Sequence, residues 1–198
     1  MRPKRDVETI YEASLDVFAR FGYQKATIED VAVRLGMTKG SLYTYVRNKE
    51  DLYHRTISYA FRKWQTAVET RVETERAADL RLVRLCETAV TYLQKEPRLR
   101  EILRNDPEIF PMFPVKDPYR ELNDISRKMI AEILALGMEQ KVFTGVDTEK
   151  TAEIIFSIYK VFIIQSYVRT DEEYISRMFS QTMDLITRGL YSRGEAPE

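Results

Sequence analysis

The sequence predicts an all-α protein in which a small N-terminal three-helix domain precedes a larger helical body, with about nine helices in total. Gly and Pro are scarce, at 7 each in 198 residues, which disfavours a turn-rich β architecture. Apolar residues recur at helical spacing along most of the chain. Cap residues and Gly or Pro stops separate these segments, so a succession of helices accounts for the pattern.

The stretch from Thr27 to Lys49 predicts two short helices around a tight turn. Thr27 and Asp30 have the spacing of a capping box, and Gly36 stands where a left-handed residue would end the first helix. Thr38 can cap a second helix that continues to Val46. The apolar face of the first helix consists of Ile28, Val31, Ala32 and Leu35. Two short helices joined by a Gly-containing turn are typical of a helix-turn-helix, whose second helix enters the DNA major groove.

Flanking helices complete the N-terminal domain and link it to the body. A first helix is predicted over residues 6–21, before Gly22, and Asn48 can cap a long helix over 49–74. The core is expected to contain Phe18, Phe21, Ile28, Val31, Leu35, Leu42 and Val46. We therefore expect a helix-turn-helix DNA-binding domain over residues 1–48 and a larger helical domain over 49–198, with helix 49–74 linking the two.

Five further helices are expected in the body. Between them, residues 106–118 contain four prolines and cannot continue a helix. The run from Ile154 to Ile164 is apolar on nearly every side, so it must be covered on every side. It falls short of the roughly 18 residues that a membrane span needs. The predicted helices cover about 82–95, 98–104, 119–140, 148–169 and 171–189, and Thr170 and Glu173 have capping-box spacing at the start of the last.

Composition narrows the class of protein. The single cysteine, Cys86, excludes a disulfide framework within one chain and suits the reducing cytoplasm. The N-terminus has positive charge but no apolar core of a secretory signal. Net charge is zero, and the first 50 residues hold nine Lys and Arg against seven Asp and Glu. This weak bias permits DNA binding without requiring it.

Catalytic and metal-binding patterns find no support. The only histidine, His54, has no cysteine or serine partner at a suitable spacing, and one His with one Cys cannot supply a metal site. The phosphate-binding loops of nucleotide enzymes do not occur. We therefore expect a protein that is not an enzyme and that uses no cofactor or metal.

Two lysines suggest a phosphate contact. Lys39 and Lys49 each follow a predicted helix cap, where a cation opposes the helix dipole by about 0.3–1 kcal/mol. An external anion would compensate that cost, and helix N-termini are good phosphate seats. The alternative is that Glu50 and Asp51 offset Lys49 while Lys39 points to water. Tyr43 and Tyr45 lie two apart on a helix, so at least one of them must be exposed.

The pattern FxxxGYxxATIEDVAxxxGMTKGSLYTYVxNKEDLY, from Phe18 to Tyr53, resembles the N-terminal domain of TetR-family transcriptional regulators. The resemblance covers about a quarter of the chain. It implies a dimer in which each third helix enters the major groove, and a divergent helical body, the domain over 49–198, that binds a ligand and dimerises. By position, phosphates would be held by Thr27, Tyr43, Tyr45 and Lys49. Bases or the groove wall would be faced by Thr38, Lys39, Gly40, Ser41 and Thr44, the last standing where many relatives carry a larger His, Tyr or Trp; Leu42 is expected in the core.

Dimerisation is expected through the last two long helices, 148–169 and 171–189. The family resemblance places it there, and the all-round apolarity of the first of these helices asks for an extra buried face. The alternative is a monomer that buries this helix at its own centre. If the dimer forms there, Phe162→Glu or Phe179→Glu should produce monomers.

The resemblance implies that the body senses a ligand, and we expect a small, largely apolar effector. Ligand-binding pockets in proteins are mostly apolar with few polar anchors. Taken one by one, the same side chains also fit a filled core. The candidate lining residues are Trp64, Tyr92, Phe110, Met112, Phe113, Met129, Phe143, Tyr159 and Phe162. The interpretation that unites these features is a cytoplasmic, homodimeric repressor that binds a palindromic operator and is released by the effector. A helical protein-interaction module that has lost DNA binding, or that senses no ligand, is the alternative.

Overall fold

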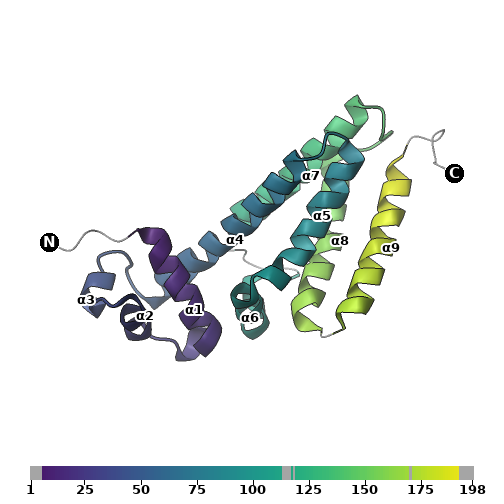
Figure 1. The fold of residues 1–198 in the computed structure, drawn as a ribbon. Helices are drawn as coiled ribbons and strands as arrows, with labels where there is room; N and C mark the ends of the chain where they lie inside the picture. The colour runs from purple at the N-terminus through teal and green to yellow at the C-terminus, as the bar shows by residue number, and fades with distance from the viewer. Residues whose placement is uncertain (1–5, 113–116, 118, 170, 192–198) are drawn as a thin grey trace. The chain divides into compact units, whose positions relative to one another are not determined.

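The computed structural model describes residues 6–112, 117, 119–169 and 171–191. Within these ranges the chain forms nine α-helices and a short 3-10 helix, so the predicted all-α fold is confirmed (Figure 1). The helices are α1 (Val7–Lys25), α2 (Ile28–Leu35), α3 (Lys39–Leu42), α4 (Lys49–Glu73), α5 (Ala78–Lys95), α6 (Pro97–Asn105), η1 (Pro107–Ile109), α7 (Arg120–Glu139), α8 (Thr148–Val168) and α9 (Glu172–Leu190).

The chain divides into two compact units. The N-terminal unit holds residues 1–63 and 96–109, and the C-terminal unit holds residues 64–95 and 110–198. Helix α4 contributes to both, and α6 belongs to the N-terminal unit although it is distant in sequence. The expected domain boundary after residue 48 stays a prediction.

The core of the N-terminal unit is built where the sequence predicts it, with one exception. Phe18 is 1% exposed and meets Tyr53 edge-on, with ring centroids 4.8 Å apart. The sequence predicts Phe21 in this core, but it lies exposed, with the Arg20 guanidinium over its ring. Gly22, at φ 71° and ψ 162°, breaks the helical geometry directly after Phe21. Phe21 is therefore the last residue before the break, and its side chain does not reach the core.

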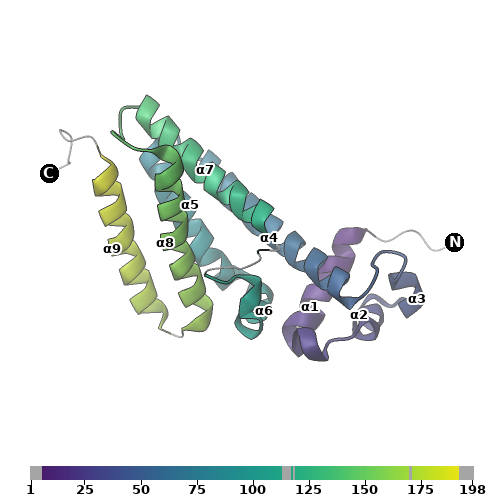
Figure 2. The same cartoon turned by 180° about the vertical axis from the view of Figure 1, so that it is seen from behind.

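The C-terminal unit packs α8 against α5, α7 and α9 (Figure 2). Helices α8 and α9 run side by side in opposite directions (Figures 1 and 2). Phe162 and Phe179 join them edge-on, with ring centroids 5.3 Å apart. The sequence predicts that α8 is covered on every side. Its neighbours cover only part of it, and one side of α8 exposes Ile154, Val161 and Val168.

The ends of α7 and α9 meet through the connector between α7 and α8. Phe143 is 2% exposed and forms an isolated β-bridge with Tyr191, and its N–H donates to the Gly137 carbonyl at 3.1 Å. At the other end of α9, the side chain of Asp171 accepts from the N–H of Tyr174 at 2.9 Å and caps the helix. Thr170, the predicted cap, lies outside the described residues.

Helix α8 corrects the expectation that its apolar run is too short for a membrane span. At 21 residues it is long and apolar enough by length and composition. Yet 44% of its most apolar window is buried inside the protein. The core helix of a globular unit passes the same test, so this finding carries no argument for a membrane.

Candidate functional site

The helix-turn-helix begins with the predicted capping box. The Asp30 N–H donates to Thr27 Oγ1 at 3.1 Å, and Asp30 Oδ2 accepts from the Thr27 N–H at 2.8 Å and from its hydroxyl at 2.6 Å. The hydrogen bond from the Thr27 side chain, followed by that from its backbone, lowers the pKa of Asp30. Both orphan donors at the start of α2 are therefore satisfied locally, which fixes where the motif begins.

The turn has the geometry that Gly36 predicts. Gly36 is left-handed at φ 61° and ψ 37°, and its N–H donates to the carbonyls of Ala32 and Val33. The Met37 N–H donates to the Ala32 carbonyl at 2.9 Å. These bonds close the last turn of α2, and a side chain at position 36 would be strained in the left-handed region.

Helix α3 is shorter than predicted. Thr38 caps it by accepting from the Ser41 N–H at 3.2 Å, but the helix ends at Leu42 instead of continuing to Val46. Beyond Leu42 the bonding tightens, because the Thr44 N–H donates to the Ser41 carbonyl at 3.2 Å and the Thr44 hydroxyl donates to it at 2.7 Å. This competing side-chain bond, together with the β-branched Thr44, favours a turn over further helix.

Of the nine residues predicted to contact DNA, seven are exposed, and Tyr45 and Lys49 are half-buried. Leu42 is fully buried, which confirms it as a core residue that anchors α3 from beneath. Tyr43 is exposed and Tyr45 is half-buried, so at least one of the two tyrosines is exposed, as predicted. The exposed positions are Thr27, Thr38, Lys39, Gly40, Ser41, Tyr43 and Thr44. Contact of these residues with DNA stays a prediction.

Lys49 is engaged inside the protein. Its ammonium donates to the carbonyls of Tyr23, Gln24 and Ala26 at 2.9, 3.3 and 3.2 Å, and it lies 4.6 Å from the centre of the Tyr23 ring. Carbonyls at the end of a helix carry partial negative charge, so a cation is stabilised there. The cost inferred for Lys49 at the start of α4 is thus offset without an external anion. Lys39, by contrast, is exposed and has no ion pair within the described ranges.

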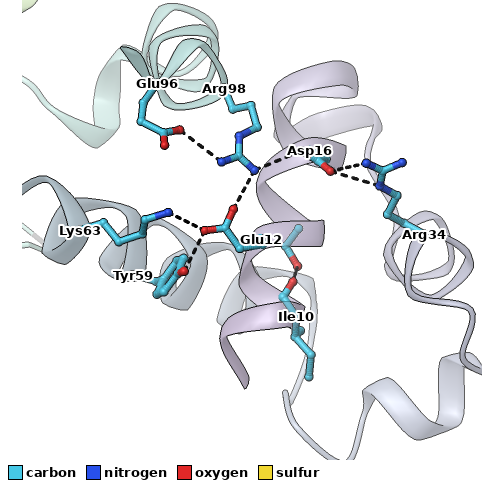
Figure 3. A network of polar contacts seen from close by, with 9 residues as sticks. Ile10, Glu12, Asp16, Arg34, Tyr59, Lys63, Glu96 and Arg98 are labelled. Carbon is cyan, nitrogen blue, oxygen red and sulfur yellow. Dashed lines mark hydrogen bonds and ion pairs between the residues drawn. The ribbon is translucent and has the colours of Figure 1, made fainter. Parts of the chain in front are cut away.

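A network of partly buried ion pairs and hydrogen bonds joins four helices of the N-terminal unit (Figure 3). Glu12 of α1 accepts from Lys63 at 2.7 Å, from Tyr59 at 2.8 Å and from Arg98 of α6 at 2.8 Å. Arg98 also reaches Asp16 at 3.2 Å, and Asp16 accepts from Arg34 of α2 at 2.6 Å. No sequence motif predicts this network, because its residues come together only in the folded protein.

The charges of this network depend on one another. Burial raises the pKa of Glu12, but hydrogen bonds from Lys63, Tyr59 and Arg98 outweigh burial and hold the pKa at about 2, below the usual 4.5. Glu12 therefore stays ionised well below pH 4.5, and its ion pair with Arg98 joins α1 to α6.

We expect Glu12→Gln to destabilise the protein by about 1–2 kcal/mol, a figure that discounts the pKa shift because a third of the side chain is exposed to solvent. Because the folded pKa is lowered, the stabilisation is present above pH 4.5 and is lost as pH falls toward 2. Urea unfolding between pH 7 and 3 should show this loss in the wild type and a shallower one in Glu12→Gln. Glu132→Gln, which removes an exposed partner of Lys128, should change stability by less than about 0.5 kcal/mol. An equal effect of the two substitutions would contradict the assignment.

The predicted ligand-lining residues separate into groups within the C-terminal unit. Trp64 stacks on Tyr92 at 5.6 Å and meets Phe110 at 6.2 Å between ring centroids. Tyr159 is buried, and Phe162 packs on Phe179. The remaining members lie apart or are undescribed: Phe143 lies under Gly137, Met129 lines a surface groove with Glu69 and Val72, Met112 is half-buried, and Phe113 lies outside the described residues.

One residue that interrupts the apolar run of α8 lies beside the first group. Lys160 is 4% exposed, and its ammonium lies 4.5 Å from the centre of the Phe110 ring. Burial lowers the pKa of Lys160. A single lysine in an apolar run gives a weak sequence signal, since long lysine side chains usually reach water from such positions.

The remaining reactive side chains offer no catalytic arrangement. Cys86 is fully buried, and burial raises the pKa of its thiol to about 12. His54 is exposed and lies 3.9 Å from Glu50 on the same helix. Among the described residues, no group of three His, Cys, Asp or Glu side chains could hold a metal ion.

Comparison with known proteins connects this geometry to a family. Residues 10–56 match the model of bacterial regulatory proteins of the tetR family. The fatty acid metabolism regulator protein of Bacillus subtilis is 19% identical, over 93% of this chain and 95% of its own length.

Solved structures share the fold across nearly the whole chain. FadR from Bacillus subtilis, a transcriptional regulator solved with stearoyl-CoA, superposes with a TM-score of 0.73 at 17% identity, over 94% of this chain and 100% of its own. A TetR transcription regulator from Haloarcula marismortui gives 0.77 at 21% identity, over 93% and 97%. The match over residues 10–56 confirms the resemblance of the N-terminal domain to the tetR family of bacterial regulatory proteins, and the solved structures show that nearly the whole chain shares their fold.

Proposed function

We propose that this protein is a cytoplasmic, ligand-responsive repressor that binds a palindromic operator as a homodimer and is released by a small effector. The observation that carries the proposal is the exposed surface from Thr38 to Thr44, held on a helix-turn-helix whose α3 is fixed from beneath by the fully buried Leu42. Small residues at Gly40 and Ser41 let this helix approach a groove wall closely.

Lys39 is the sharpest test of the DNA-binding face. Its exposed ammonium is free of ion pairs in the described part of the chain, so Lys39→Ala removes a charge without breaking an internal contact. We expect about 10-fold weaker binding to DNA from the protein's own upstream region, and a salt dependence reduced by about one counterion per half-site. Fluorescence anisotropy at several salt concentrations measures both. Lys49→Ala is a poor probe, because it also removes the ammonium that caps α1.

Lys128→Ala is the matched control, since this lysine lies exposed on α7 in the C-terminal unit. It should leave both affinity and salt dependence unchanged. Absence of sequence-selective binding by the wild type would remove the repressor proposal and favour the protein-interaction module. An unchanged salt dependence in Lys39→Ala would take Lys39 out of the interface.

The proposed dimer is supported by a continuous apolar stripe on α8 and α9. Val161 and Met178 each precede by one residue the Phe162–Phe179 contact that joins the two helices. Because the helices run in opposite directions, these two residues lie on the same side of the pair. The stripe consists of Ile154, Val161 and Val168 at seven-residue spacing on α8, with Tyr174, Met178 and Leu185 on α9, all exposed. A second copy of the same stripe is the simplest cover, since a two-fold interface uses one patch twice.

The proposed effector carries an apolar acyl or aryl body. Trp64, Tyr92 and Phe110 form an aromatic cluster within the C-terminal unit, which suits such a ligand. A fatty acid metabolism regulator among the relatives and a stearoyl-CoA complex among the similar structures support the acyl class. The effector acts only if it binds the operator-free state more tightly than the operator-bound state.

A further inference from the structure

Lys160 places a positive charge inside an apolar helix bundle. It lies in the middle of α8 and is 4% exposed. Its ammonium is 4.5 Å from the centre of the Phe110 ring and 5.8 Å from that of Phe156. Aromatic faces attract cations, but they replace only part of the hydration that burial removes.

Within the described part of the chain, the ammonium has neither an ion-pair partner nor a hydrogen-bond acceptor. Among the described residues no carboxylate lies within 4.0 Å of Nζ, and no hydrogen-bond acceptor is in reach. No fully enclosed side-chain nitrogen or oxygen in this part of the chain lacks a hydrogen bond. The Lys160 nitrogen lacks one, so it must border a space that a water-sized molecule can reach.

The two carboxylates that attract Lys160 from a distance, Asp117 and Glu153, have other hydrogen-bond or ion-pair partners. Asp117 attracts Lys160 from a distance, but its two oxygens accept from the Tyr119 N–H at 2.9 Å and from Asn123 Nδ2 at 2.7 Å. Glu153 pairs with Arg127 at 3.3 Å. Among the described residues, Lys160 therefore carries a positive charge beside aromatic rings that no ion pair or hydrogen bond compensates directly. One charge, with carboxylates nearby, suits a monoanion better than a group of phosphates.

We propose that Lys160 binds the carboxylate of an amphipathic monoanion, a fatty or aryl carboxylate whose hydrocarbon part lies against Phe110 and Phe156. This inference rests on the proposed function, because it names the polar end of the proposed effector. The ammonium then gains a hydrogen-bonded anion that the described residues do not supply, and the carboxylate gains a charge-assisted bond in a water-poor setting.

Trp64 is the only tryptophan, and its ring meets Phe110, which in turn lies against Lys160. Its fluorescence therefore reports binding at this place without DNA. The probes are dodecanoate, the uncharged dodecanol and dodecanoyl-CoA, titrated into the full-length wild type, Lys160→Met and the control Lys128→Met. We expect the wild type and Lys128→Met to bind dodecanoate at least about 10-fold more tightly than dodecanol. Lys160→Met should lose that preference, with dodecanoate weakened about 10- to 100-fold and dodecanol within about threefold.

The outcomes separate this inference from the proposed function. Equal binding of dodecanoate and dodecanol by the wild type, or equal weakening of both by Lys160→Met, overturns the carboxylate site and leaves the acyl effector standing. Binding of dodecanoyl-CoA without dodecanoate does the same. If none of the three probes binds, both the acyl effector and this site are overturned. Release of operator DNA, measured with the same probes, tests the regulatory role separately.

Discussion

Gly137→Ala is expected to destabilise the protein by about 3 kcal/mol, an effect at the upper end of those seen when a packed core is overfilled. A Cβ at this position would lie 2.8 Å from Cγ of Phe143 and closer still to two other carbons of the same ring. The ring has little freedom to move, because Phe143 is 2% exposed and lies against Tyr191. Its backbone is held as well, since the N–H groups of Val142 and Phe143 both donate to the Gly137 carbonyl.

Urea unfolding followed by circular dichroism measures this loss, and the melting temperature should fall by roughly 6–12 °C. Gly189→Ala is the matched control: it is also a helical glycine, and a Cβ added there would have nothing within 4 Å. At this position the substitution should be neutral or stabilise by up to about 1 kcal/mol, since alanine favours helix. Adding Phe143→Leu to Gly137→Ala should recover part of the loss. Similar effects of the two alanine substitutions would show that the Phe143 ring yields without cost.

The elements that sequence reasoning located correctly are those fixed by local chemistry. The capping box of Thr27 with Asp30 and the left-handed Gly36 need only a few neighbouring residues, so their pattern is visible in the chain. The early end of α3 is local too: the N–H and the hydroxyl of Thr44 both donate to the Ser41 carbonyl. The helical spacing of apolar residues does not predict such a bond.

The features that sequence reasoning missed depend on residues brought together by the fold. Lys49 meets carbonyls more than twenty positions earlier in the chain, and Glu12 meets Arg98 from a helix 86 positions later. A charge argument made one helix at a time therefore assigns Lys49 an external anion. The same limit applies to Lys160, whose significance comes from the Phe110 ring and from the absence of a neutralising carboxylate among the described residues.

The predicted interface variants need the same correction. Phe162 and Phe179 are 7% and 8% exposed and pack against each other within one protomer. A glutamate at either position would disrupt the α8–α9 contact itself, so monomers formed by Phe162→Glu or Phe179→Glu would not locate the interface. The residues able to report on a second copy are those of the stripe, whose side chains are exposed in the protomer.

Leu185→Glu is expected to convert the protein into a folded monomer and to weaken operator binding by more than about 100-fold. Leu185 is 72% exposed, so the substitution leaves the protomer core intact. In a two-fold interface the new charge is buried twice, and each uncompensated burial costs several kcal/mol. Sedimentation velocity measures the oligomeric state. Fluorescence anisotropy with operator DNA measures the affinity, which is higher when two linked helix-turn-helix domains bind one operator.

Leu80→Glu is the matched control, because this leucine of α5 is also exposed but lies outside the stripe, and it should leave the dimer unchanged. Dimers that persist in both Leu185→Glu and Val161→Glu would exclude the α8–α9 face, whereas monomers from Leu80→Glu would move the interface to α5.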